Sequence, residues 1–535
     1  MRKNILIGGK AGQGIDVAAS LISNGLSKEG YYIFNYRDYP SLIKGGQNYN
    51  IISVSDEKIG SYESKLDILI ALDKKTIENH GNKLKDDGIL LKLDDFDVNN
   101  DYKKVVNVFM TGVLYKTIGL PKERLEKEVK DKFEGKEYLS LDLEAGENGY
   151  NEVKTKIELD KSNDDNLKTL TGSEGIAEGS LDAGIDCYFA YPMTPATPIL
   201  HLLAGRQVDE NILVFQPENE LGAINMGLGA AHAGAKAMVG TSGGGYDLMQ
   251  ESMSMQGIAE IPLVVYLAQR PGPGSGVPTY STQGDLDIAV KGGHGEYPRV
   301  TLAPGDAKES RRLTNEAFYF AEKFRILSVL LGDKHVAESE YAFEEFEDSL
   351  KVQRNIESQK GGEFKNYKIT DNGNSPRSVS GLTTVKSTSY EHNEMGITTE
   401  EIEMVNKMND KRSRKTKLLK EEAEKFEMYK VHGNENSDIT VVGWGSTKGA
   451  ILDAIKDLDV KFLQVLYLRP FPEEVKEILE ESNNIILVEN NSTGLLGNLI
   501  AEKTGMIIPE ENKILRYDGR PFESDTLREK IEENM

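Results

Sequence analysis

The chain is poor in cysteine and tryptophan, with one of each among its 535 residues. A single thiol excludes a disulfide within the chain, and it excludes an iron–sulfur cluster ligated only by cysteines of this chain. The thiol belongs to Cys187, which lies in an apolar run typical of a strand. We therefore expect Cys187 to be a small core residue.

Long apolar runs are also missing. No stretch approaches the roughly 20 apolar residues that are needed to span a bilayer, so no membrane partner is expected. The first residues pass directly into the apolar run 4–7 and offer no small-residue cleavage site. This N-terminus predicts a cytoplasmic protein rather than an exported one.

Positive charge is in deficit. The sequence has 64 lysine and arginine residues against 87 aspartate and glutamate residues, which gives a formal net charge of −23. Because a nucleic-acid-binding protein needs a basic face, this balance argues against a nucleic-acid partner. A polyanionic cofactor stays compatible with it, since a few local cations are enough to bind one.

The remaining composition is typical of a globular α/β enzyme, with 38% hydrophobic residues and 52 glycines. The length corresponds to about three domains of roughly 150 residues each. Changes in composition place these domains at residues 1–165, 171–400 and 437–535, with a polar linker at about residues 151–170. We predict three α/β domains with open, mainly parallel sheets.

A polar, charge-rich stretch from about residue 338 to residue 436 precedes the last domain. It contains one expected helix at residues 404–429. The basic cluster Lys-Arg-Ser-Arg-Lys at residues 411–415 lies on this helix, and we expect it to form a solvated face.

The first domain opens with a strand, a glycine-rich segment and a helix. The strand covers residues 4–7, and the helix follows the apolar positions 17, 18, 21 and 22. The segment between them contains Gly8, Gly9, Lys10, Gly12 and Gly14. Glycines at this place let backbone amides approach a phosphate at the helix N-terminus, so we predict a phosphate site of general type. A tight turn without a ligand is the alternative.

The second domain contains the motif Tyr-Pro-Met-Thr-Pro-Ala-Thr-Pro at residues 191–198, between an apolar strand at 187–190 and an apolar stretch at 199–203. Proline fixes φ and is tolerated in the first turn of a helix, so the pattern predicts strand, rigid turn and helix. A threonine in such a turn can offer its hydroxyl beside free helix N–H groups, which suits an anion. A proline-rich loop that only ends a strand is the alternative.

Other special loops of this domain also follow expected strands, at 212–215, 237–242 and 262–268. A loop at 216–220 leads into a small-residue helix at 221–233, glycines 243–245 form a turn into a helix at 246–259, and a Gly/Pro-rich loop covers 269–279. Because open α/β sheets bind ligands at the carboxyl ends of their strands, these loops should share a site. The last domain repeats the α/β pattern, with strands at 439–442, 461–466 and 484–489 and a helix at 449–458.

Four of these motifs together resemble the α subunit of the 2-oxoacid:ferredoxin oxidoreductases. They are the proline motif, Glu218-Asn219-Glu220 with its small-residue helix, Thr-Ser-Gly-Gly-Gly at 241–245, and Gln-Arg-Pro-Gly-Pro at 269–273. The N-terminal Gly-Gly-x-x-Gly-Gln-Gly looks like the start of the family's γ domain, fused ahead of α. The resemblance covers nearly the whole chain and implies a γ domain, a thiamine-diphosphate pyrimidine-binding-type domain and a transketolase C-terminal-like domain.

The resemblance implies a thiamine-diphosphate enzyme that oxidatively decarboxylates a 2-oxoacid. Glu220 aligns with the family's catalytic glutamate, whose carboxyl group hydrogen-bonds an aminopyrimidine nitrogen and favours the imino tautomer. Glu218 is the fallback for this role, and an ordinary acid at a helix N-terminus is the alternative. The cofactor-binding residues implied are Tyr191, Pro192 and Glu218. The implied substrate-binding residues are Thr194, Arg270 and Thr279, with Arg270 offering a fork of donors to a carboxylate.

The resemblance also implies partners. Mg²⁺ and an iron–sulfur cluster belong to a β subunit that shares the thiamine diphosphate, ferredoxin accepts the electrons, and coenzyme A accepts the acyl group. The phosphates of coenzyme A fit the glycine segment with Lys10, Arg37 or Lys44, and no metal ligands are assigned to this chain. Because the cofactor site is shared with a second kind of subunit, the resemblance implies a hetero-oligomer.

Departures from the family pattern leave the substrate open. Met193, Ala196 and Thr197 stand where the family has Ile and Ser-Ser, and Gly244 replaces its proline. We favour 2-oxoglutarate. The alternatives are a pyruvate-type or indolepyruvate-type subunit, a non-catalytic partner subunit, and a stand-alone nucleotide-binding protein.

Overall fold

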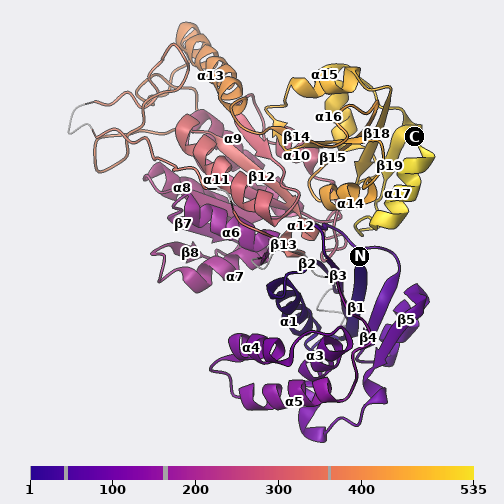
Figure 1. Ribbon diagram of the computed structural model, residues 1–535. Coiled ribbons are helices and arrows are strands. Elements are labelled where there is room, and N and C mark those ends of the chain that lie inside the picture. The colour runs from indigo at the N-terminus through magenta and orange to yellow at the C-terminus, as the bar shows by residue number, and fades with distance from the viewer. Residues whose placement is uncertain (1, 41–45, 161–166, 347, 359–362) are drawn as a thin grey trace.

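Three sheets with covering helices make up the protein (Figure 1). The computed structural model describes residues 2–40, 46–160, 167–346, 348–358 and 363–535. The N-terminal sheet and its helices lie at the bottom of Figure 1, the second sheet lies above them, and the C-terminal sheet lies at the upper right. Helix α13 (Ile402–Ala423) rises at the upper left.

The first sheet has seven strands in the order β5-β4-β1-β3-β2-β13-β6. Only β5, β4 and β1 run parallel to one another, and the other neighbours are antiparallel. The strands are β1 (Lys3–Lys10), β2 (Tyr32–Asp38), β3 (Gln47–Ser55), β4 (Leu66–Ala71), β5 (Leu84–Lys92), β6 (Lys168–Thr171) and β13 (Glu340–Phe343). The helices of this part are α1 (Ile15–Lys28), α2 (Lys74–His80), α3 (Val106–Thr117), α4 (Lys122–Phe133) and α5 (Leu139–Asn151).

Strand β1 is buried on both faces. Ile5 and Ile7 belong to a core that includes α1 and α3, while Leu6 belongs to a second core with Tyr341 and Phe343 of β13. This alternation has the period of two that a strand imposes. A continuous apolar run, as in residues 5–7, is the sequence signature of such a strand.

Strands β6 and β13 come from distant parts of the sequence and finish this sheet. Glu340 and Tyr341 pair with Asn35 and Phe34 of β2, and β13 pairs along its whole length with β6. The expected linker therefore contains the end of α5 and the strand β6, with residues 161–166 outside the described residues.

The second sheet also has seven strands, in the order β17-β11-β12-β10-β9-β7-β8, and all neighbours except β17 and β11 are parallel. Its strands are β7 (Cys187–Ala190), β8 (Leu213–Phe215), β9 (Ala237–Thr241), β10 (Leu263–Gln269), β11 (Arg299–Leu302), β12 (Leu327–Asp333) and β17 (Tyr467–Arg469). Its helices are α6 (Gly172–Asp182), α7 (Thr197–Arg206), α8 (Glu220–His232), α9 (Gly243–Ala259), α10 (Leu286–Lys291), α11 (Ala307–Phe324) and α12 (Lys334–Glu338).

The third sheet has five strands in the order β14-β16-β15-β18-β19, and only β14 is antiparallel to its neighbour. Its strands are β14 (Tyr429–Gly433), β15 (Ile439–Trp444), β16 (Lys461–Val465), β18 (Asn484–Glu489) and β19 (Lys513–Leu515). Its helices are α14 (Thr447–Ala454), α15 (Glu474–Glu480), α16 (Leu495–Thr504) and α17 (Ser524–Glu533). The α/β class predicted from the sequence is confirmed; the first sheet is mixed, and the other two are mainly parallel.

Several element boundaries differ from the sequence expectations. Strand β1 continues through Gly8 and Gly9 to Lys10, α9 already begins at Gly243, and α13 ends at Ala423. The glycines at 8 and 9 are needed inside the strand because a β-carbon at Gly8 would approach Thr76 Cγ2 to 2.7 Å.

The expectation that the basic cluster on α13 is a solvated face is wrong. Lys411 and Lys415 are completely buried, and both ammonium groups contact the carboxylate of Glu260, at the end of α9. Lys411 Nζ also donates to Ser375 Oγ at 3.0 Å and to Tyr367 O at 3.2 Å. Burial opposes ionisation of Glu260, but the two lysines hold the pKa of its carboxyl group well below the usual range. This triad fastens α13 to the second sheet.

Glu260→Gln should unfold the protein at a lower denaturant concentration. The variant leaves two buried lysines without a counter-ion, and losing one partner of a buried ion pair costs about 3–5 kcal/mol. Urea unfolding followed by circular dichroism measures this loss. Glu421→Gln on the same helix is the control, since Glu421 meets Lys417 only at 3.9 Å on an exposed face. Equal midpoints for the two variants would contradict the role of the triad.

Candidate functional site

The special loops of the second sheet meet at one edge, as the sequence analysis predicted. Strands β7, β9 and β10 are parallel and in register, with Tyr188 opposite Met238 and Met238 opposite Val264. The segment after each strand therefore leaves the sheet on the same side. These segments are the proline motif after β7, residues 216–219 after β8, Ser242 after β9 and Arg270 after β10.

Glu220 is the first residue of α8 and is 5% exposed. Asn219 caps this helix, because its side chain accepts a hydrogen bond from Gly222 N at 2.7 Å. The carboxyl side chain lies against the first turn of α9, where a β-carbon at Gly245 would come within 2.6 Å of Glu220 Cγ. Glycine at 245 thus allows the carboxyl group to enter this space. Glu218, the fallback residue, is exposed.

Arg270 joins two of the loops. Its Nη1 donates to Thr194 O at 2.9 Å, so the end of β10 is linked to the proline motif after β7. Burial lowers the pKa of Arg270, and the nearby carboxylates of Asp285 and Glu220 raise it in part. Arg270, Thr194 and Glu220 therefore lie in one electrostatic cluster.

Two hydroxyl groups in these loops are buried without a hydrogen-bond partner. They are Thr279 Oγ1 and Ser242 Oγ, from the loop after β10 and the residue before α9. Buried polar atoms in native proteins normally have a partner, so such groups call for a ligand or a water molecule. Tyr191 is more exposed, at 37%, while Pro192 and Thr194 are half-buried.

The loop after β10 is held at its far end by the third sheet. The Gln283 side chain donates to Trp444 O at 2.7 Å and accepts from Asn490 N at 2.8 Å. Its own backbone N–H donates to Asn490 O at 2.7 Å. These bonds fix the position of Thr279, four residues earlier.

A second joint connects the same loop with the first sheet. Asp38, at the end of β2, forms an ion pair with Arg520 at 3.2 Å. The guanidinium of Arg520 lies 3.6 Å from the centre of the Tyr280 ring. One residue of the loop is thus packed between the N-terminal and C-terminal parts of the chain.

The N-terminal turn joins β1 to α1 through glycines in the left-handed region. Gly12 and Gly14 have φ values of 90° and 71°, and Gly14 begins α1 without a side-chain cap. Lys10 is exposed beside this turn. Of the two further cations, Arg37 is paired with Asp16 at 3.2 Å and Lys44 lies outside the described residues.

Family profiles match most of the chain. One, described as "Pyruvate flavodoxin/ferredoxin oxidoreductase, thiamine diP-bdg", matches residues 178–411, and another, "Pyruvate ferredoxin/flavodoxin oxidoreductase", matches residues 4–152. A 2-oxoacid:ferredoxin oxidoreductase subunit alpha from Sulfolobus sp is 30% identical, covering 99% of this chain and 96% of the relative. The chain belongs to the 2-oxoacid:ferredoxin oxidoreductases.

Other relatives of this oxidoreductase subunit carry more specific names. The 2-oxoglutarate synthase subunit KorA of Archaeoglobus fulgidus is 29% identical over 61% of this chain and 89% of the relative. The solved 2-oxoglutarate:ferredoxin oxidoreductase from Magnetococcus marinus has a TM-score of 0.89 at 25% identity, with 100% of this chain and 99% of that chain covered. The resemblance inferred from the four motifs, an α subunit with a fused γ domain and a thiamine-diphosphate-binding region, is confirmed.

In the described part of the oxidoreductase subunit, no helix has the length and apolar character needed to cross a membrane. No three His, Cys, Asp or Glu side chains are grouped there as metal ligands would be.

Asp285 is a site residue that the sequence analysis missed. Its Oδ2 atom is buried without a hydrogen-bond partner, and a β-carbon at Gly243 would come within 2.7 Å of it. Burial and then the charge of Asp247 raise the pKa of Asp285 to about 6, while Arg270 acts in the opposite direction. The only signal in the sequence is an acid directly before helix α10, which is too common to single it out.

Asp285→Asn should change how stability depends on pH. The pKa of Asp285 lies above the ordinary value of 3.8, so the folded chain holds this proton when the unfolded chain has already lost it. The native side chain therefore costs stability as pH rises through about 4 to 6. The melting temperature of the variant should exceed that of the native chain at pH 7, and the two should converge as pH falls toward 4. Asp287→Asn, at an exposed position of α10, is the control. A melting-temperature difference that does not vary with pH would contradict this.

Proposed function

We propose that this subunit supplies the pyrimidine half of a thiamine-diphosphate site and binds the carboxylate of a 2-oxoacid there, in an oxidative decarboxylation that forms acyl-coenzyme A and reduced ferredoxin. The observation that carries the proposal is the common location of Glu220 and Arg270. A buried carboxyl group and a half-buried guanidinium act on one another at the ligand-binding edge of a parallel sheet.

The residues of this edge fit thiamine diphosphate. Glu220 offers a buried carboxyl group, the lack of a side chain at Gly245 makes room for that group, and Ser242 Oγ is buried without a partner. The resemblance adds Tyr191 and Pro192 of the proline motif and the exposed Glu218 as cofactor contacts. When bound, thiamine diphosphate supplies a nucleophilic carbon and an electron sink. Glu220 serves it by holding a proton against an aminopyrimidine nitrogen.

The substrate carboxylate would meet Arg270, Thr194 and Thr279. Among the described residues, Arg270 donates one side-chain hydrogen bond, from Nη1 to Thr194 O. Its other N–H groups are therefore available to a carboxylate. The unpartnered Thr279 Oγ1 adds a hydroxyl group. The hydrogen bond to Thr194 keeps the guanidinium from swinging out of the site.

We propose 2-oxoglutarate as the preferred acid. The support is the name of the Archaeoglobus relative and the Magnetococcus structure, which holds 2-oxoglutarate, coenzyme A and succinyl-CoA. The differences at Met193 and Gly244 leave a pyruvate-type or branched-chain or indolepyruvate-type specificity as the alternative.

For coenzyme A we propose the N-terminal turn. Gly12 and Gly14 place the first N–H groups of α1 at the surface, and Lys10 is the nearest cation in the sequence. Because Gly8 and Gly9 have no side chains, α2 and Gln13 can approach the end of β1 closely. A phosphate at this place would compensate the positive end of α1.

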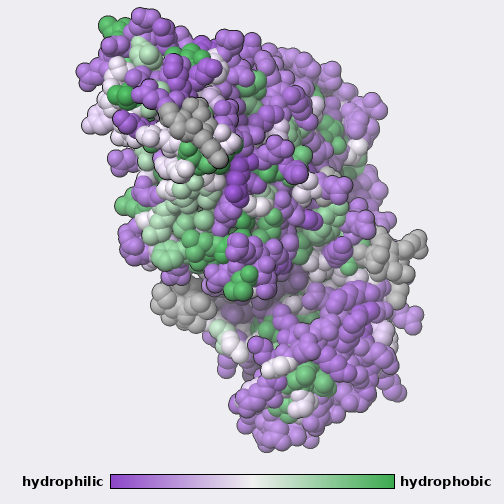
Figure 2. All heavy atoms as spheres, turned by 90° about the vertical axis from the view of Figure 1, so that its left-hand side faces the viewer, coloured by the Kyte–Doolittle hydropathy of each residue, from purple (hydrophilic) through white to green (hydrophobic). Residues whose placement is uncertain are grey.

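A partner subunit would cover the face next to this site. Large apolar side chains are exposed on β8, α8 and α9: Leu213, Phe215, Leu221, Met226 and Leu248. Figure 2 shows hydrophobic surface across the middle of the molecule on the side where α7 and α8 lie. We propose that a β subunit binds there and brings the Mg²⁺–diphosphate site and the iron–sulfur cluster, with ferredoxin as electron acceptor.

The test is a dye-reduction assay with the native complex that copurifies with this chain. Coenzyme A-dependent reduction of a viologen is followed with a panel of 2-oxoacids that includes 2-oxoglutarate, pyruvate and indolepyruvate. Reduction with 2-oxoglutarate alone supports the proposal, and reduction with another acid corrects the substrate. A complex that contains thiamine diphosphate and the cluster but reduces the dye with none of them would favour the non-catalytic alternative.

Glu220→Gln should abolish turnover, with a loss of about 100-fold or more, while the complex still assembles. The amide cannot exchange the proton that the carboxyl group holds, and general acid–base groups contribute roughly 10²–10⁴-fold. Turnover is measured by the viologen assay and assembly by size-exclusion chromatography. Glu210→Gln, at an exposed position of the same domain, is the control and should keep most of the activity. An active Glu220→Gln complex would remove the assignment.

Arg270→Ala should raise the KM for the 2-oxoacid about 10-fold or more and leave the KM for coenzyme A nearly unchanged. The variant removes the fork of donors that binds the carboxylate, a charge-assisted interaction of about 1.5–3 kcal/mol. Steady-state kinetics with each substrate varied in turn measures the two values. Equal changes in both would count against a substrate contact.

A further inference from the structure

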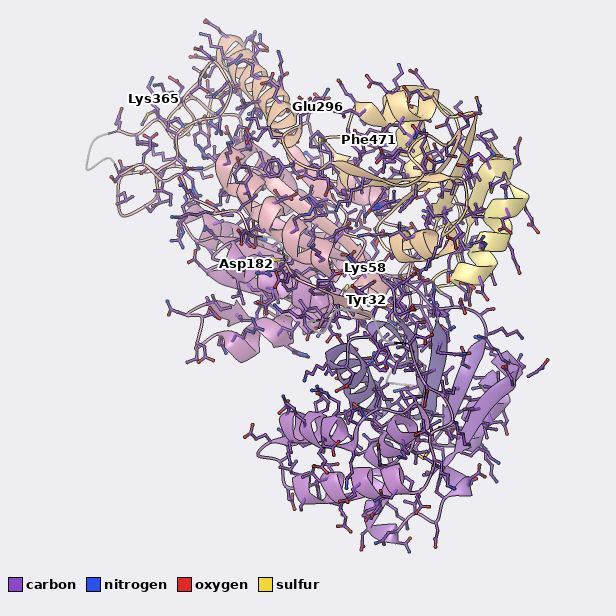
Figure 3. All side chains as sticks on the ribbon, viewed as in Figure 1. Tyr32, Lys58, Asp182, Glu296, Lys365 and Phe471 are labelled. Carbon is purple, nitrogen blue, oxygen red and sulfur yellow. The ribbon has the colours of Figure 1, made fainter. Side chains whose placement is uncertain are left out.

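A cavity of about 1370 Å³ lies near the amino end of β11 in the second sheet. The loops of the candidate site, here called the cofactor edge, leave the sheet at the opposite, carboxyl ends of its strands. Its lining comes from α13, from the segment between α10 and β11, and from residues 468–477 and 502–504. Glu296 and Phe471, both lining residues, are labelled in Figure 3 between α13 and the C-terminal helices. Arg299 and Arg469 form its inner wall.

Arg299 is the first residue of β11 and is only 2% exposed. Its Nη2 donates to Gly292 O, and its guanidinium lies 4.4 Å from the centre of the Tyr297 ring. Its other two nitrogens, Nε and Nη1, are buried without a hydrogen-bond partner. Unsatisfied charged donors of this kind are costly in a protein interior.

Arg469 brings a second guanidinium to the same place from the C-terminal part of the chain. It ends β17 and pairs with Thr301 of β11, two residues after Arg299. Its Nη1 donates to Val290 O at 2.8 Å and its Nη2 to Tyr297 O at 3.3 Å. Burial and then the charge of Arg299 lower the pKa of Arg469 to about 10. Two like charges thus oppose one another within the fold.

Two of the carboxylates that line the cavity, Glu502 and Glu473, are paired with lysines. Glu502, which acts on Arg469, is 2.6 Å from Lys291 and 2.8 Å from Lys503. Glu473 contacts Lys420. Among the described residues, Arg299 and Arg469 form no ion pair with a carboxylate. The described chain therefore holds two neighbouring guanidinium groups with carbonyl partners but without a counter-ion.

We propose that the cavity wall formed by Arg299 and Arg469 is a binding site for a small oxyanion. An oxyanion accepts from the free nitrogens of Arg299, and it neutralises the repulsion between the two guanidinium groups. Phosphate and a small carboxylate share this chemistry.

The site is separate from the cofactor edge. Arg299 is level with Leu263, at the start of β10, while Arg270 follows the end of that strand. The separation of seven positions between Leu263 and Arg270 corresponds to about 20 Å. The oxyanion site therefore does not rest on the proposed function.

The test is calorimetric titration of the purified complex with inorganic phosphate and, in a second arm, with acetate. Ionic strength is kept constant with chloride, and thiamine diphosphate and coenzyme A are present at saturation so that the proposed cofactor sites are filled. Arg469→Met is chosen because Arg469 is half-buried. Phosphate or acetate should bind the native complex, and Arg469→Met should weaken that binding about 10-fold or more. The stronger of the two ligands identifies the class of oxyanion.

A second Arg469 variant and a control variant at Lys417 complete the test. Arg469→Lys retains a charge but loses the fork, and it should also weaken binding if Arg469→Met does not fold. Lys417→Met, an exposed lining residue of α13, should bind like the native complex. The proposal is overturned if neither ligand binds the native complex, or if Arg469 variants and Lys417→Met bind equally.

Discussion

The hydrogen bonds of the Gln283 amide group to Trp444 and Asn490 hold the arrangement of the site together. They fix one end of the loop after β10 to the third sheet, and Arg270 fixes the other end to the proline motif. Between these two anchors, Tyr280 packs on Arg520, which is paired with Asp38 of the first sheet. A loop fastened in this way has already lost the conformational entropy that ligand binding would otherwise have to remove. Thr279 is thereby presented in a defined position.

Much of this edge could be predicted from sequence because it depends on local signals. Apolar strands, prolines at a helix start and glycines after a strand each act within a few residues, and parallel pairing then brings their loops together. The placement of Glu220, Thr194 and Arg270 at one edge follows from those rules.

The parts that sequence could not predict depend on distant partners. Strands β6 and β13 have four residues each, and their sequences do not indicate that β13 pairs with β2. The cluster at 411–415 has the composition of a solvated helix, and only the position of Glu260, about 150 residues earlier in the chain, makes two of its lysines core residues. Asp285 was missed for the same reason: its burial is produced by Gly243 and its neighbours in space. Whether a charged residue is buried depends on its tertiary contacts, and these cannot be deduced from local composition.

Pairing between β2 and β13 has a consequence for how the N-terminal unit relates to the rest of the subunit. Residues 340–343 lie between β2 and β6, so the sheet that begins with β1 is finished only after most of the second sheet has been encoded. The sequence boundary near residue 165 is therefore not a boundary in space. A chimera that exchanges only residues 1–165 with those of a relative would present β2 to a foreign β13, and a fragment ending there would leave β2 as an open edge, prone to pairing with other chains. A transplant that keeps this sheet whole therefore includes residues 340–343 together with the N-terminal strands.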